Sequence, residues 1–178
     1  MNETLEVTVL IKCSAWTEAV PGAEDVCRRS ATAAFRAGRE TAELPPGPYE
    51  ASVVLADDGF IRPLNRQYRG RDEPTNVLSF ANLEGSNGKE GDTAGPRPGQ
   101  TPRVLGDVIV AYETMRAEAD KDGGDIGDHL CHLVVHGMLH LLGYDHGTDA
   151  EAERMERMEV RVLSALGAAG HIADGMGR

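Results

Sequence analysis

The segment from Ile126 to Leu142 constrains the fold of this 178-residue chain more than any other. Its apolar residues would cover most of the circumference of a helix: Leu130, Leu133, Val134, Val135, Met138, Leu139, Leu141 and Leu142. A helix that is apolar on nearly all sides is buried in its protein. The segment therefore predicts a central helix that other elements cover.

The same helix carries a single polar stripe. At about 100° per residue, four histidines fall on one narrow line: His129, His132, His136 and His140. His136 and His140 are one turn apart and so share a face. Gly143 can adopt the positive φ that ends a helix and turns the chain. This turn would bring His146 to face His136 and His140.

Three neutral imidazoles that converge on one point bind zinc and leave a fourth position open, as in catalytic zinc sites. We therefore predict that His136, His140 and His146 bind one Zn²⁺ ion. His129 and His132 lie upstream on the stripe and are expected to support the site or the fold. Asp145 either orients a ligand or forms the turn, and the sequence leaves both roles open.

The spacing His-x-x-x-His-x-x-Gly-x-x-His is also that of metzincin metalloproteases. Those enzymes place a glutamate directly after the first histidine, where it acts as the general base. Gly137 occupies that position here. Because base catalysis contributes about 10²–10⁴-fold to the rate, a degenerate metalloprotease is the least favoured function.

The rest of the chain predicts a single α+β domain over residues 1–166, with strands at 5–11, 49–55, 77–80 and 104–111. Helices are expected at 23–37, from Asp57 or Asp58 to Arg69, and after the capping box of Thr148 and Glu151. Residues 82–102 are rich in Gly, Pro and charge and predict a flexible loop. The tail at 167–178 is expected to be disordered.

Composition excludes some classes and leaves others open. The net charge of −11 argues mildly against a general nucleic-acid binder. However, Arg62, Arg66, Arg69 and Arg71 lie close together, either as a solvated helix face or as a local basic patch. The sequence has no apolar run of membrane-spanning length, and its first residues lack the basic-then-apolar pattern of a signal segment, so we expect neither a membrane span nor a signal peptide. Its three irregularly spaced cysteines predict reduced thiols and a cytoplasmic location.

Four stretches carry a family resemblance: Leu64-Asn65-x-x-Tyr68-Arg69, Pro74-Thr75-Asn76-Val77-Leu78-Ser79-Phe80, Leu105-Gly106-Asp107 and the histidine run from His136 to His146. Together with Met155 and Glu159 in the last helix, they resemble the YbeY family of bacterial rRNA maturation factors. The segment at 82–102 looks longer than is typical of that family, and the tail is extended.

The resemblance implies a zinc-dependent, single-strand-specific endoribonuclease that acts in 16S rRNA 3′-end maturation and in late ribosome quality control. It implies zinc on the three histidines, Arg69 as the essential arginine, and a small mixed sheet of about four strands packed with helices around a zincin-like metal helix. RNA, the 16S rRNA precursor and the small ribosomal subunit are then the expected partners of a monomer.

Under the same resemblance, Arg62, Arg66 and Arg71 become candidates for the wall of a groove that binds single-stranded RNA. One alternative to the nuclease stays open. A ribosome-assembly factor without catalytic activity could use the same zinc as a structural ion, because Gly137 leaves the site without a glutamate base.

Overall fold

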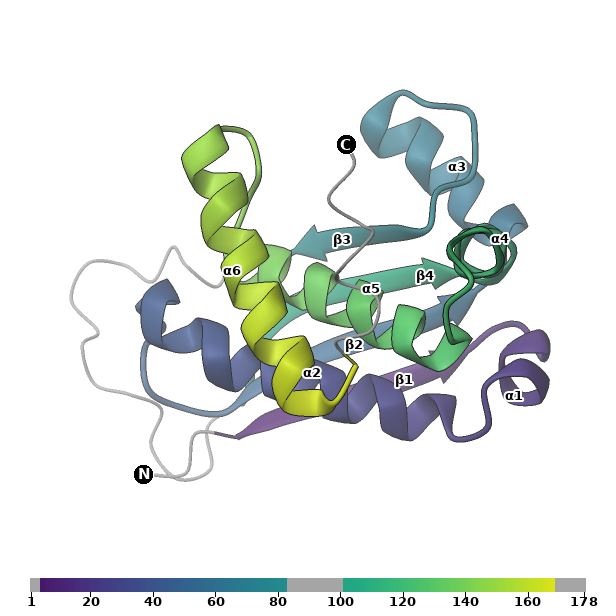
Figure 1. The fold of residues 1–178 in the computed structure, drawn as a ribbon. Helices are drawn as coiled ribbons and strands as arrows, with labels where there is room; N and C mark the ends of the chain where they lie inside the picture. The colour runs from purple at the N-terminus through teal and green to yellow at the C-terminus, as the bar shows by residue number, and fades with distance from the viewer. Residues whose placement is uncertain (1–3, 83–100, 169–178) are drawn as a thin grey trace.

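The computed structural model describes residues 4–82 and 101–168, which form one four-stranded mixed sheet and its helices (Figure 1). The strand order is β1-β2-β4-β3. Strands β1 (Leu5–Ile11), β2 (Tyr49–Ala56) and β4 (Arg103–Ala111) run parallel, whereas β3 (Val77–Ala81) pairs antiparallel with β4. The predicted α+β class and mixed sheet are confirmed.

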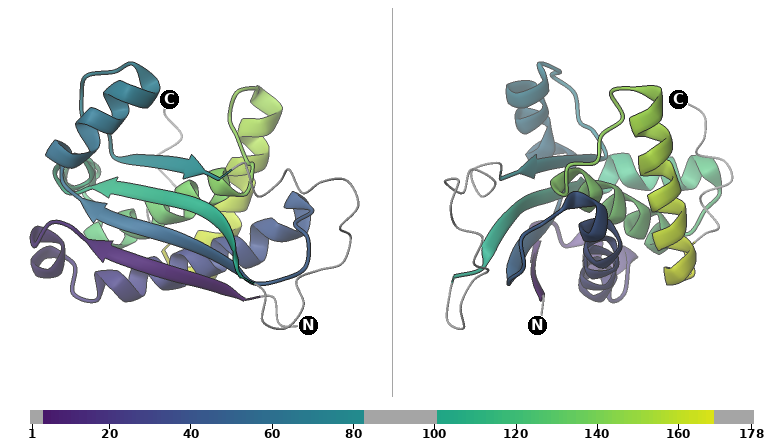
Figure 2. Two further views of the ribbon diagram at one scale, coloured as in Figure 1. Left: turned by 180° about the vertical axis from the view of Figure 1, so that it is seen from behind. Right: turned by 90° about the vertical axis from the view of Figure 1, so that its left-hand side faces the viewer.

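The two faces of the sheet follow the alternation of side chains along a strand. Val53 of β2 and Val108 of β4 face the main core, which α2, α5 and α6 complete on one side of the sheet (Figure 2, right). Their neighbours Val54 and Ile109 face the other side, where Ile61 of α3 packs on them. Both faces are therefore buried in the second halves of β2 and β4, at Val53–Ala56 and Val108–Ala111, as in most parallel sheets.

Six helices surround this sheet in the described residues. They are α1 (Ala15–Ala19), α2 (Ala23–Ala42), α3 (Asp58–Arg69), α4 (Tyr112–Asp122), α5 (Ile126–Leu141) and α6 (Asp149–Leu166). The sequence predicted neither α1 nor α4, and α2 extends beyond the predicted end at residue 37. The Asp57 cap of α3, its stop at Gly70 with φ 70°, and the Thr148 capping box of α6 are confirmed.

Helix α5 is the central helix that its apolar character predicts. It packs against α2, α4 and α6 and against strands β3 and β4. It approaches the sheet closely at Gly137, where a Cβ atom would lie 2.5 Å from Cγ1 of Val108. The hydroxyl of Ser79 on β3 donates to the Gly137 carbonyl at 3.1 Å. Contacts with β3 and β4 therefore fix the position of α5 relative to the sheet next to His136.

The expected flexible loop at 82–102 lies outside the described residues except for its ends. The predicted tail begins at Gly167, which ends α6 with φ 76°, and Ala168 is buried at 3% exposure. The remainder of that tail also lies outside the described residues. No helix in the described ranges combines the length and the apolar character that crossing a membrane requires.

Candidate metal centre

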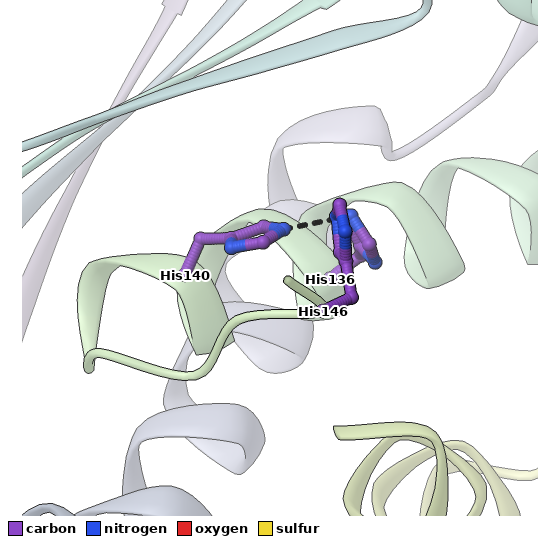
Figure 3. Close-up of side chains that lie close together, drawn as sticks. All are labelled: His136, His140 and His146. Carbon is purple, nitrogen blue, oxygen red and sulfur yellow. Dashed lines mark hydrogen bonds between the residues drawn. The ribbon is translucent and has the colours of Figure 1, made fainter. Parts of the chain in front are cut away.

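Three histidine side chains converge where α5 ends (Figure 3). His136 and His140 extend from the last turns of α5, and His146 comes from the segment between α5 and α6. One ring nitrogen of each histidine lies within 4.8 Å of the other two. His136 and His140 are partly buried and His146 is exposed, so the group opens to solvent on one side.

A tight turn brings His146 back to the helix. Gly143 has φ 89°, a left-handed conformation that favours glycine, and the Tyr144 amide donates to the Leu139 carbonyl at 3.0 Å. The Tyr144 ring is buried, its hydroxyl is hydrogen-bonded to that of Thr41, and the guanidinium of Arg154 lies 5.1 Å from its centroid. The turn predicted from Gly143 is therefore anchored to both α2 and α6.

The Nδ1 atoms of His136 and His140 are each hydrogen-bonded to an acceptor. His136 Nδ1 lies 2.5 Å from the Glu159 carboxylate, and His140 Nδ1 lies 2.9 Å from the Tyr144 carbonyl. A carbonyl and an ionised carboxylate can only accept, so both Nδ1 atoms carry the proton. In the neutral form of each ring, Nε2 then presents a lone pair, which is the donor arrangement of metal-binding histidines.

These two Nε2 atoms lie 3.1 Å apart (Figure 3). When both rings are neutral with the proton on Nδ1, no proton lies between the two Nε2 lone pairs, and a cation would relieve their repulsion. Two ligands of a tetrahedral zinc at 2.0–2.1 Å are about 3.3–3.4 Å apart. The spacing and the all-nitrogen donor set therefore fit a zinc ion.

Burial lowers the pKa of His140 to about 4, with further lowering from the neighbouring His136 and His146. Its ring is therefore neutral at physiological pH. Because only the neutral imidazole binds a metal, protons compete weakly for this ligand.

Glu159 of α6 contacts the candidate metal ligand His136, and the residue patterns assigned it no role. Its side chain is 13% exposed and also lies 3.6 Å from His132 Nε2. Burial raises its pKa, but hydrogen bonds from His132 and His136 outweigh that effect and lower the pKa to about 2. The available signal was its place one turn after Met155 on the buried face of an amphipathic helix.

The two upstream histidines have different roles. His132 supports the site through Glu159. His129 is buried and lies 2.9 Å from the Glu118 carboxylate of α4, which also accepts from Asn76 at 3.0 Å. Burial raises the pKa of Glu118, and the bonds from His129 and Asn76 more than offset it, so the net shift is downward. His129 thus ties α5 to α4 and to the start of β3.

Neither Asp145 nor position 137 provides a carboxylate general base directed at the three histidines. The Asp145 carboxylate accepts from the His146 backbone amide at 2.8 Å, which is the turn-forming role. At Gly137 even a Cβ atom would lie within 3.0 Å of Ser79 Oγ and closer still to Val108. The position that carries the general base in metzincins therefore has no room for a glutamate.

The four arginines of α3 and the segment after it are not equivalent. Arg62 pairs with Asp72 at 3.0 Å, and Arg71 lies 3.9 Å from Glu73. Within the described ranges, Arg66 and Arg69 form no ion pair. A pocket of about 410 Å³ lies at the end of α3, lined by Asn65, Arg69, Arg71, Glu73, Pro74 and Thr75. Among the described contacts, none joins Arg69 to the three histidines.

Comparison with known proteins places the chain in a family. The family model described as Endoribonuclease YbeY matches residues 14–167. The chain belongs to this family. A member from Paramagnetospirillum magneticum is 51% identical over 94% of this chain and 95% of that protein. Another, from a Bradyrhizobium strain, is 48% identical over 96% of this chain and 93% of its own. Both are named Endoribonuclease YbeY.

The fold has a counterpart among known structures. The solution structure of the Thermotoga maritima protein TM1509 aligns with a TM-score of 0.51 and 22% identity, over 97% of this chain and 99% of that one. That likeness concerns the fold. The family membership itself confirms the resemblance read from the four sequence stretches and from α6.

Proposed function

We propose that this protein is a metal-dependent endoribonuclease that cleaves single-stranded RNA. The observation that carries the proposal is the pair of Nε2 atoms 3.1 Å apart, on rings that are each held by a hydrogen bond at Nδ1, with His146 beside them. The family, whose members bear the name endoribonuclease, supplies the substrate class.

The proposal extends to the finer features that the sequence predicts. The ion is Zn²⁺, one per chain, bound by His136, His140 and His146. The substrate is the 16S rRNA precursor on the small ribosomal subunit, cleaved during 3′-end maturation and late quality control. The protein acts in the cytoplasm as a monomer. The all-histidine donor set supports zinc, and the motif resemblance supports the rRNA substrate.

The chain's own residues divide the work. Glu159 and the Tyr144 carbonyl hold the imidazoles of His136 and His140 with Nε2 directed at the ion. When bound, zinc would lower the pKa of a water ligand to about 7 and polarise a phosphoryl oxygen. Arg69 stabilises the negative charge that grows on the phosphoryl oxygens, because its guanidinium can form paired hydrogen bonds with them.

The remaining arginines bind rather than react. Arg62, Arg66 and Arg71 attract the phosphate backbone and align the strand. Two of these three are already paired with Asp72 and Glu73, so RNA phosphates would have to displace or share those partners. Arg66, which has no ion pair in the described ranges, should therefore contribute most to the salt dependence of binding.

The test measures RNA cleavage and zinc content together in nuclease-free protein. We expect His136→Ala to lose both. Arg69→Ala should retain zinc and slow cleavage on the order of 10²–10³-fold, as when one charge-stabilising donor is removed. Arg157→Ala, an exposed arginine on α6, is the matched control and should cleave normally. Loss of zinc in Arg69→Ala would contradict its role at the phosphate.

A non-catalytic assembly factor is the second candidate, and the closed packing at Gly137 favours it because the site has no glutamate base there. Wild-type protein that binds zinc and RNA but leaves the RNA intact would establish this alternative. Cleavage of casein instead of RNA would support the metalloprotease function that the sequence analysis disfavours.

A further inference from the structure

An aromatic pair lies at the end of α3, where Tyr68 directly precedes Arg69, one of the residues that line the arginine pocket. Tyr68 is 61% exposed, although it belongs to the last turn of the helix. Its ring packs against Phe80 of β3 in an edge-to-face arrangement, with the ring centroids 4.9 Å apart and the planes at 67°. Such a contact holds one side of a ring and leaves other ring surface open to a ligand.

This exposed ring is held in place from beneath. Phe80 packs onto the second apolar cluster of the sheet, with Leu78 and Ile61 among its members. The contact with Phe80 restrains the Tyr68 ring, so less side-chain freedom is lost when a ligand packs against it. A rigid, exposed aromatic ring is a feature of proteins that bind single-stranded nucleic acid by stacking.

The charge around the ring suits a phosphate chain. Asn65 and Arg69, which precede and follow Tyr68 in the same helix, line the pocket together with Arg71. From Arg62 to Glu73, four arginines oppose two acidic residues, Asp72 and Glu73, so this segment is positive although the whole chain carries −11. A ligand that carries a flat ring next to a negative charge would match both the exposed Tyr68 ring and the positive charge of this segment.

Strand β3 connects this surface to the metal helix. Phe80 contacts Tyr68 on one face of the sheet, whereas the adjacent Ser79 binds the carbonyl of Gly137, next to His136, on the other. Among the described strands, β3 is the last of the sheet, so its outer edge is not paired with another strand. The aromatic pair and the metal helix are therefore joined through adjacent residues of one edge strand.

We infer that Tyr68, supported by Phe80, is a stacking platform for one base of the RNA substrate, with Arg69 and Arg71 binding the adjacent phosphate. This inference rests on the proposed function and adds the subsite that holds the strand. Stacking explains why an aromatic ring stays exposed next to arginines, and it accepts any base because every base has an aromatic face.

The test uses a short single-stranded oligoribonucleotide that carries 2-aminopurine, whose fluorescence falls when it stacks on an aromatic ring. We expect Tyr68→Ala to abolish this quenching and to weaken binding roughly 5- to 150-fold, the range for losing one stacked base. Tyr68→Phe should retain both. Phe60→Ala removes an exposed aromatic from the first turn of the same helix and is the matched control.

An abasic residue in place of the 2-aminopurine should make the RNA insensitive to Tyr68→Ala. The platform would be overturned if Tyr68→Ala bound as tightly as wild type, if Tyr68→Phe lost as much as Tyr68→Ala, or if Phe60→Ala weakened binding equally. Ring-dependent quenching in a protein that cleaves no RNA would support the platform and reject the nuclease. If Tyr68→Ala binds and cleaves RNA as well as the wild type, the platform is rejected and the nuclease function is retained.

Discussion

Glu159 is the residue whose substitution most directly tests the architecture of the metal centre. Its carboxylate lies 2.5 Å from His136 Nδ1 and is ionised at neutral pH, because its pKa is lowered to about 2. The bond is therefore charge-assisted, fixes the tautomer of His136 and makes its Nε2 a better donor. We expect Glu159→Gln to weaken zinc binding although no ligand is removed.

The magnitude follows from what each substitution removes. Hydrogen-bond partners of metal ligands typically contribute 10–100-fold to metal affinity, or about 1.4–2.7 kcal/mol. Glu159→Gln keeps an acceptor oxygen but loses the charge, so we place it at about 10-fold. Glu159→Ala leaves Nδ1 of a partly buried His136 without its partner and also releases His132, so we place it near 100-fold.

Competition with a chromophoric zinc chelator at neutral pH measures this affinity. Glu156→Gln is the matched control, because it makes the same change on an exposed position of α6. RNA cleavage by Glu159→Gln should fall at limiting zinc and recover at saturating zinc. Zinc affinity unchanged in both Glu159 variants would refute the reasoning that the carboxylate positions His136.

Two further predictions concern stability. Gly137→Ala should lower the free energy of unfolding by about 1–3 kcal/mol in urea titrations, because the new Cβ would lie 2.5 Å from Val108 Cγ1, whereas Gly59→Ala, with its nearest atom at 3.4 Å, should not. The metal-free protein should lose stability as the pH falls from about 6.5 to 4, because the unfolded chain binds a proton at His140 before the folded chain does. A second loss should follow from about 4.5 to 2, where the unfolded chain binds a proton at Glu159 before the folded chain does. Thermal melting temperatures that stay constant across both ranges would contradict this prediction.

Local pattern was enough to predict the central helix and its ligands. Side chains 100° apart on a helix define the polar stripe, and Gly143 marks where the chain must turn. Both are short-range properties, which is why His136, His140 and His146 could be assigned without a structure. The strands of the mixed sheet were equally readable, because alternation and β-branched residues are local as well.

Helix α4 shows where local signals failed. It begins directly after β4, with Ala111 at its N-cap and no side-chain capping bond, so no start signal separates strand from helix. Its buried residues, Met115 and Ala119, are too few to show a strong apolar stripe. Packing against α5 and α3, rather than its own sequence, stabilises this helix.

The sequence by itself determined the three candidate metal ligands and the glycine at the position of the metzincin base, because both follow from spacing along one short segment. Only the tertiary structure decided which groups orient the imidazoles. Glu159 lies 23 residues from His136 in the sequence, and it reaches Nδ1 because α6 packs on α5. Likewise, Tyr68 meets Phe80 only because α3 packs on the sheet, and contacts between distant segments leave no local pattern to read.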